Sequence, residues 1–286
     1  MPLKMSNKKY FGLLLVSILL LCGCTSAQPT IPGAKDEAKD EKKAETVLKI
    51  KNQARVIHVL VALCDNENQG IVPVPAFLGD GEDAAKNLYW GAAFGVKTFF
   101  SKSANWTKVS EIDDPKENVL QRIVFKHKRG NVYLVADAYR GSKMKETIAD
   151  FFAAVSGAKL ENIRIDDSTL QILGSADLVA FVGHNGLMDF DLASQPEKKD
   201  DDRRDAIILA CASRQYFAEA LKKTSASPLL WTSNLMAPEA YILHDALEGW
   251  VGGETAGQIQ TRAAAAYAKY QKISQKSAQK LLVTGW

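Results

Sequence analysis

The chain has 286 residues, 47% of them hydrophobic, and a formal net charge of +3 at pH 7. This is enough apolar material for one sizeable core. Lysine and arginine are scattered among aspartate and glutamate, so no basic stripe forms and the composition argues against a nucleic-acid partner.

The first residues predict a bacterial export signal rather than part of the fold. Lys4, Lys8 and Lys9 flank the start of the apolar stretch 11–21, which is too short to predict a membrane span. A basic segment followed by a short apolar segment is typical of a signal peptide.

The end of this signal predicts lipid attachment. Residues 21–24, Leu-Cys-Gly-Cys, resemble a lipobox, in which small residues precede a cysteine that is acylated and becomes the new N-terminus. We assign acylation to Cys24, because Leu21 directly before Cys22 makes Cys22 a poor acceptor. The alternative is an ordinary secretory signal cut nearby, for example after Ala27.

Three segments follow from this assignment. Residues 1–23 are the expected signal peptide, 24–50 a flexible tether and 51–286 one α/β domain. The tether is small, proline-containing and then charged in both signs, so it cannot bury a core. No aspartate follows Cys24, so we expect a lipid-anchored envelope protein, on the outer membrane if the cell has one.

From residue 54 onward, apolar stretches of strand length alternate with stretches of helix length. The expected strands cover 54–64, 131–139, 177–184, 205–213 and 228–234. The expected helices cover 83–102, 143–158, 214–224, 238–253 and 255–275. This alternation predicts an α/β fold with a mostly parallel sheet and helices on both faces. No GxGxxG opens a helix after the first strand and no GxxxxGK[ST] is present, so nucleotide-binding folds lose their main support.

In open α/β sheets, ligands bind outside the carboxyl ends of the strands. His184 ends the third expected strand, and Cys211 ends the fourth, 27 residues later (211 − 184). If these strands are neighbours, the two side chains lie roughly 5–10 Å apart. A thiol becomes a good nucleophile when an imidazole favours the thiolate or takes its proton.

The neighbours of these two residues fit attack on a carbonyl group. Gly186 leaves a backbone N–H unshielded by any side chain, which suits an oxyanion donor. Ala210 and Ala212 flank Cys211 and leave room for a peptide carbonyl.

The two strand ends, LVAFVGHNG at 178–186 and AIILACAS at 206–213, resemble the caspase-like cysteine peptidases, which include caspases, metacaspases, gingipains and legumain. That family carries an apolar strand ending in His-Gly and a later one ending in Ala-Cys or a close variant. The resemblance implies the three-layer caspase–hemoglobinase fold. The family has glycine directly after the histidine, where this chain has Asn185.

The resemblance implies a cysteine endopeptidase that acts on a peptide or protein, with no metal and no other cofactor. His184 is the implied acid and base and Cys211 the nucleophile, with the backbone amides of Gly186 and Cys211 as oxyanion donors. Asp65 and Glu67 follow the first strand, so we expect an acidic pocket that prefers arginine or lysine before the scissile bond.

Several alternatives stay open at this point. His184 can be a turn histidine, and Cys211 can be structural or form a disulfide with Cys64, which we otherwise take as structural. Asp189 and Asp191 can be read as metal ligands near His184, although no second histidine stands at a ligand spacing. The rival function is a non-catalytic binding or structural lipoprotein that keeps the fold. Asn185, in place of the family's glycine, favours this alternative.

Overall fold

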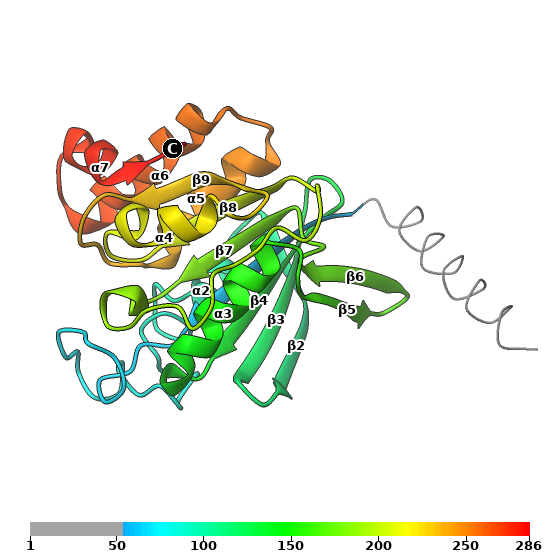
Figure 1. The fold of residues 1–286 in the computed structure, drawn as a ribbon, viewed down its shortest axis with the longest axis horizontal. Helices are drawn as coiled ribbons and strands as arrows, with labels where there is room; N and C mark the ends of the chain where they lie inside the picture. Colours follow the sequence, from blue (N-terminus) through cyan, green and yellow to red (C-terminus); the bar gives the residue numbers. More distant parts are fainter. Residues whose placement is uncertain (1–53) are drawn as a thin grey trace, which may run out of the picture. The chain divides into compact units, whose positions relative to one another are not determined.

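The computed structural model describes residues 54–286, which belong to one compact unit, and the predictions for the signal peptide, Cys24 and the tether lie outside them. An eight-stranded mixed sheet forms the centre, in the order β10-β9-β8-β7-β1-β4-β3-β2 (Figure 1). Its strands are β1 Arg55–Ala62, β2 Trp106–Lys116, β3 Val119–His127, β4 Val132–Tyr139, β7 Leu178–Val182, β8 Arg204–Leu209, β9 Ala226–Thr232 and β10 Leu282–Val283. A separate hairpin consists of β5 Leu160–Ile165 and β6 Ser168–Leu173.

The helices connect several of these strands, and three of them follow β9 in succession. They are α2 Val96–Ser101, α3 Met144–Val155, α4 Ser213–Leu221, α5 Ala240–Val251, α6 Ala256–Gln271 and α7 Gln275–Leu281. Two short 3-10 turns, η1 Gly141–Lys143 and η2 Gly186–Met188, follow β4 and β7.

All five strands expected from the sequence are present, and they are the parallel part of the sheet. β9, β8, β7, β1 and β4 pair with their neighbours in parallel, whereas β10, β3 and β2 add antiparallel edges. The expectation of a mostly parallel α/β sheet is therefore confirmed. The carboxyl ends of the parallel strands all lie on the left side of Figure 1.

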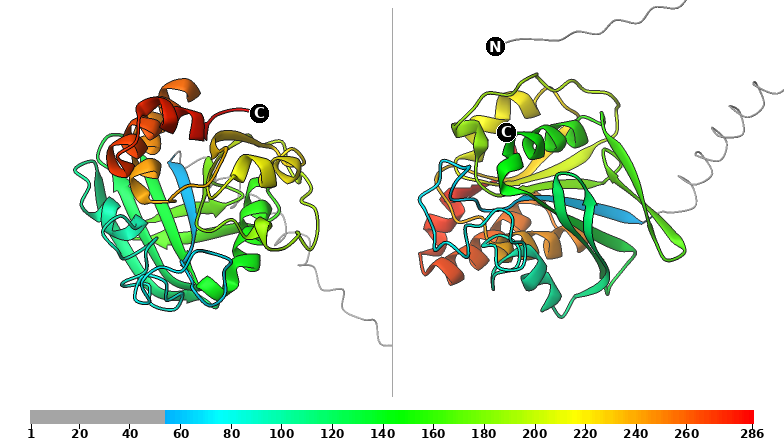
Figure 2. Two further views of the ribbon diagram at one scale, coloured as in Figure 1. Left: turned by 90° about the vertical axis from the view of Figure 1, so that its left-hand side faces the viewer. Right: turned by 90° about the horizontal axis from the view of Figure 1, so that it is seen from below.

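Helices cover both faces of the sheet, because β1 is apolar on both sides. Ile57 and Val59 pack into a core shared with α2, α5 and α6, while Val56 and Leu60 pack into a second core shared with α3 and α4. The right-hand view of Figure 2 shows α3 and α4 on one side of β1 and the orange and red helices on the other. Strands buried on both faces are expected to be mainly apolar along their whole length, as these are apart from the buried His58 and Asp137.

The helix expected over 83–102 is wrong for most of its length. Only α2 is helical there, and the residues before it form successive turns that wrap the end of β1. The Asn87 side chain accepts from Cys64 N–H (3.0 Å) and donates to Cys64 O (2.8 Å), which binds the segment to β1. A Cβ on Gly91 would lie 2.0 Å from the carbonyl oxygen of Ala85, so the chain folds back on itself there.

The sequence also did not predict the hairpin of β2 and β3 or the hairpin of β5 and β6. β2 lies at the edge of the sheet and is mostly exposed and charged, so it carries no apolar run. Charged residues on an edge strand block pairing with other chains. They also interrupt the apolar run from which a strand is predicted. Within residues 54–286, no helix is long and apolar enough to cross a membrane.

Candidate active site

β7 and β8 are neighbouring parallel strands, which brings the ends that carry His184 and Cys211 together. Their register runs from Leu178 opposite Asp205 to Val182 opposite Leu209, a constant offset of 27 residues (209 − 182). The same offset separates His184 from Cys211, two residues beyond the last pair. Neighbouring strands are about 4.8 Å apart, so continuing this register sets the two residues side by side at the carboxyl edge.

His184 is held in a buried turn directly after β7. Gly183 precedes it at φ 152°, and a Cβ there would lie 2.9 Å from the carbonyl oxygen of Ala62 on β1. The turn η2 then returns the chain, so that Asp189 Oδ2 lies 2.6 Å from His184 Nε2. His184 is 8% exposed, and with Nε2–H donating to the Asp189 carboxylate, Nδ1 is the atom left to act as a base.

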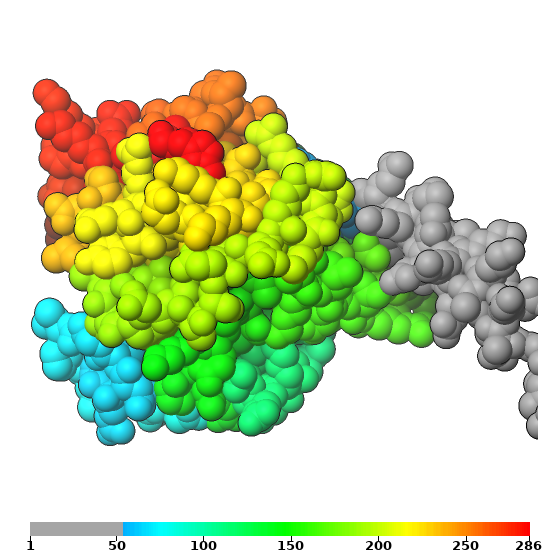
Figure 3. Space-filling view, in the orientation of Figure 1, coloured from blue at the N-terminus to red at the C-terminus, as the bar shows by residue number. Residues whose placement is uncertain are grey.

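Asp189 connects this turn to the loop that follows β1. Its Oδ2 also accepts from the Gly70 N–H at 3.4 Å, and a Cβ on Gly70 would lie 2.6 Å from Oδ1. Figure 3 shows the yellow-green segment that includes this region directly beside the cyan loop on one face of the molecule. The carboxylate is therefore fixed against His184 from two sides.

Asn185, the residue that departs from the family pattern, joins the two strand ends. Its side chain is fully buried, and Nδ2 donates to the carbonyl oxygen of Cys211 at 2.6 Å. Its Oδ1 accepts from the Leu187 N–H at 3.1 Å and so caps η2. One side chain thus fixes the histidine loop against the cysteine loop, which a glycine could not do.

Cys211 lies at a tight turn between β8 and α4. Ala212 follows it at φ 47° and ψ 34°, a left-handed conformation that costs energy for any residue with a Cβ. Buried hydrogen bonds stabilise this turn. Ser213 Oγ donates to Ile208 O at 2.8 Å, and Thr232 Oγ1 accepts from Ser213 N–H at 3.0 Å. Thr232 Oγ1 also bonds to Ala210 O. A strained turn held by such contacts is typical of functional sites.

The thiol itself contacts the loop after β9. Cys211 Sγ lies 3.4 Å from both the N–H and the carbonyl oxygen of Met236. In the part of the chain that the structure describes, no hydrogen bond joins Sγ to His184. Catalytic hydrogen bonds are often long or poorly aligned without substrate, so the lack of this bond is compatible with a base that acts when substrate arrives.

The expected oxyanion donors need one correction. The Gly186 N–H already donates to His184 O at 3.2 Å, and a Cβ on this glycine would lie 2.6 Å from Met144 Cγ, so this amide is packed away. The backbone N–H groups of Asn185 and Cys211 have no acceptor among the described residues. Amides without an intramolecular acceptor are free to donate to an incoming oxyanion.

Of the two carboxylates expected to form an acidic pocket, only that of Glu67 is exposed. Asp65 is 4% exposed, and its carboxylate accepts from the N–H groups of Glu67 (2.9 Å) and Asn68 (3.0 Å) and from the Asn68 amide (2.8 Å). A Cβ on Gly81 would lie 2.4 Å from Asp65 Oδ2, so the carboxylate is packed inside its own loop. Glu67 is exposed and keeps its charge accessible.

The alternative of a Cys64–Cys211 disulfide is not realised, because both cysteines are free. β7 lies between β1 and β8 in the sheet and separates the two strand ends. Cys64 is buried, and burial raises the pKa of its thiol to about 11. Cys64 therefore fits the structural role expected from the sequence.

The metal alternative receives no support from the geometry. No group of three or more histidine, cysteine, aspartate or glutamate side chains within residues 54–286 could hold a metal ion. Asp189 bonds instead to the histidine, and Asp191 is exposed.

Sequence reasoning found His184 and Cys211 but missed the residues that position them. Asp189 lies five residues after the histidine, beyond a turn that no periodicity predicted. Asn185 was read as a defect, although an asparagine before a Gly-Leu-Met turn is a known capping signal. Met236 approaches Cys211 only because β9 lies beside β8.

Comparisons with protein-family models, with curated proteins and with solved structures find no match to this chain. The site is therefore interpreted from its own geometry.

Proposed function

We propose that this chain is a lipid-anchored envelope protein with a caspase-like fold that acts as a cysteine endopeptidase. The observation that carries the proposal is the parallel pairing of β7 with β8, whose register ends at Val182 opposite Leu209, two residues before His184 and Cys211. The buried His184–Asp189 pair and the strained turn after Cys211 support it.

The proposed chemistry follows from these positions. His184 Nδ1 takes the thiol proton, and Cys211 Sγ attacks the scissile carbonyl carbon. The oxyanion accepts from the N–H groups of Asn185 and Cys211. The imidazolium then protonates the leaving amine, and water hydrolyses the thioester to restore the thiol. Asp189 holds the imidazole in the required tautomer and stabilises its charged form.

The substrate is a peptide or protein segment. A preference for arginine or lysine before the scissile bond now rests on Glu67 alone, since the Asp65 carboxylate is packed in its loop. A panel of fluorogenic peptides that vary this residue tests the preference, and a preference for aspartate or asparagine contradicts it.

The decisive experiment compares peptide cleavage by the wild type, Cys211→Ala and Cys64→Ala. We expect Cys211→Ala to abolish cleavage and Cys64→Ala to retain it. Asp189→Asn should lower kcat with little change in KM, while the exposed neighbour variant Asp191→Asn should leave both unchanged. A folded wild type that cleaves nothing, or a Cys211→Ala variant that still cleaves, rejects the proposal.

The second candidate is a non-catalytic binding lipoprotein of the same fold. The contact between Cys211 Sγ and Met236 favours it, because the thiol is directed at the backbone rather than at His184. Iodoacetamide separates the two, since an activated Cys211 should react well below pH 8, whereas an inert thiol in folded protein supports the binding role.

A further inference from the structure

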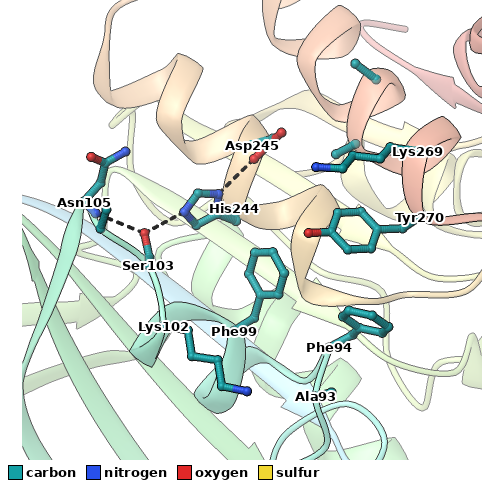
Figure 4. A pocket seen from close by; sticks show the side chains of 13 residues that line it. Ala93, Phe94, Phe99, Lys102, Ser103, Asn105, His244, Asp245, Lys269 and Tyr270 are labelled. Carbon is teal, nitrogen blue, oxygen red and sulfur yellow. Dashed lines mark hydrogen bonds and ion pairs between the residues drawn. The ribbon is translucent and has the colours of Figure 1, made fainter.

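A second cluster of hydroxyl, imidazole and carboxylate lies at a cavity of about 660 Å³ (Figure 4). The cavity is lined by α2 with the residues on either side of it and by helices α5 and α6, and none of its lining residues belongs to the candidate active site. Ser103 comes from the loop between α2 and β2, and His244 and Asp245 come from α5.

These three side chains form a continuous hydrogen-bonded chain. Ser103 Oγ lies 2.8 Å from His244 Nε2, and His244 Nδ1 lies 2.9 Å from Asp245 Oδ1. The Asn105 N–H donates to Ser103 Oγ at 3.2 Å, so the hydroxyl is oriented to give its own proton to the imidazole. With Nδ1–H donating to the Asp245 carboxylate, Nε2 is the basic atom, which is the tautomer that activates a serine.

The surroundings hold the imidazole and support its charged form. The ring of Phe99 packs edge-on against His244 with centroids 5.4 Å apart. Glu248 Oε1 lies 3.9 Å from His244 Nε2 and is fixed by Trp106 Nε1 at 2.8 Å. When His244 accepts a proton, Asp245 and Glu248 therefore both stabilise the imidazolium.

The cavity wall indicates the class of ligand. Phe94, Phe99 and Tyr270 supply aromatic surface, with the Phe94 and Tyr270 centroids 5.2 Å apart. Lys102 and Lys269 add two ammonium groups, and neither has a carboxylate partner among the described residues. Aromatic walls with unpaired cations fit a small ester that carries an aromatic or apolar group and a negative charge.

We propose that Ser103, His244 and Asp245 form a second, esterase-type site. Ser103 Oγ attacks the ester carbonyl carbon while His244 takes the hydroxyl proton. The ester C–O bond breaks, and the leaving alcohol departs with that proton. Water then hydrolyses the acyl-serine, releasing the acid and restoring the hydroxyl. The Ala104 N–H, in the residue after Ser103, has no acceptor within residues 54–286 and can donate to the developing oxyanion.

Covalent labelling tests the nucleophile independently of peptidase activity. Cys211→Ala protein is treated with a fluorophosphonate probe and digested with trypsin, which places Ser103 in the peptide 103–108 and Ser101 in 98–102. Ser101 is the matched control, because its Oγ donates to Lys97 O within the helix and contacts no imidazole. We expect label on the first peptide and none on the second.

Two variants complete the test, both made in the Cys211→Ala background. Ser103→Ala should abolish labelling and the hydrolysis of a 4-nitrophenyl hemisuccinate ester. Asp245→Asn, at a half-exposed position that should not affect folding, should slow labelling by about 100-fold or more, the lower end of the range for loss of base activation. A folded protein that leaves Ser103 unlabelled, or labels it at the same rate in Asp245→Asn, overturns the proposal.

Discussion

Asn185 offers the sharpest test of how the two strand ends are held together. Asn185→Ala removes the bond from Nδ2 to Cys211 O (2.6 Å) and the bond from Leu187 N–H to Oδ1 (3.1 Å). Each hydrogen bond contributes about 0.5–1.5 kcal/mol net, so the pair gives a loss of about 1–3 kcal/mol in the free energy of unfolding. For a domain of this size that corresponds to a drop of about 2–12 °C in Tm.

Urea denaturation followed by far-UV circular dichroism measures this loss directly. The midpoint should fall while the slope with denaturant stays constant. Asn131→Ala is the matched control, because Asn131 is exposed and its side chain makes no hydrogen bond in the described part of the chain; it should change stability by less than about 0.5 kcal/mol. Equal midpoints for the two variants would refute the role assigned to Asn185.

Asn185→Asp separates the two bonds. It keeps an acceptor for the Leu187 N–H but replaces the donor to Cys211 O with a second acceptor in a fully buried position. Burial and the facing carbonyl favour the protonated acid, so the pKa of this carboxyl should rise above its ordinary value of about 3.9. The destabilisation should then be small below pH 4 and grow as pH rises. A pH-independent loss would contradict this reasoning.

Three further predictions concern buried charges and thiols. Asp137→Asn leaves the buried Arg122 without its main partner (2.6 and 2.8 Å) and should cost about 3–5 kcal/mol, whereas Asp201→Asn on the surface should cost less than about 1 kcal/mol in the same denaturation assay. Although burial alone raises the pKa of Asp137, its hydrogen bonds from Arg122 and His58 hold it well below its usual range. Its stabilisation should therefore be complete above about pH 4 and disappear as pH falls further, which acid denaturation of wild type and Asp137→Asn would show by converging. Native Cys64 should resist iodoacetamide at pH 8 and react only after unfolding, as peptide mapping would show, because its pKa is raised to about 11.

The parallel strands were predictable because of how they are buried. β1, β4, β7, β8 and β9 are buried on both faces, so each appears as a mainly apolar run, interrupted by His58 in β1 and by Asp137 in β4. Helices α3 to α6 were predictable for a related reason, since each buries one face. The exposed edge strand β2 and the short hairpin of β5 and β6 lack such runs and were missed.

Before α2, the sequence predicted a helix that the structure does not have. Its apolar residues stand at helical spacing, but Asn87 binds the backbone of Cys64 and Gly91 allows a tight fold-back onto Ala85. The Asn87 contact joins residues 23 positions apart along the chain, and no local pattern reveals it. Tertiary contacts overrode local propensity at this place.

The sequence by itself determined the parallel core and the two residues at its carboxyl edge, because apolar runs and strand ends are local properties. The tertiary structure alone decided what surrounds them. Asn185 reaches Cys211, and Asp189 reaches His184, only because β7 and β8 pair with a 27-residue offset and η2 reverses the chain. Directional hydrogen bonds depend on distances of a few tenths of an ångström, which the folded arrangement sets and the order of residues does not.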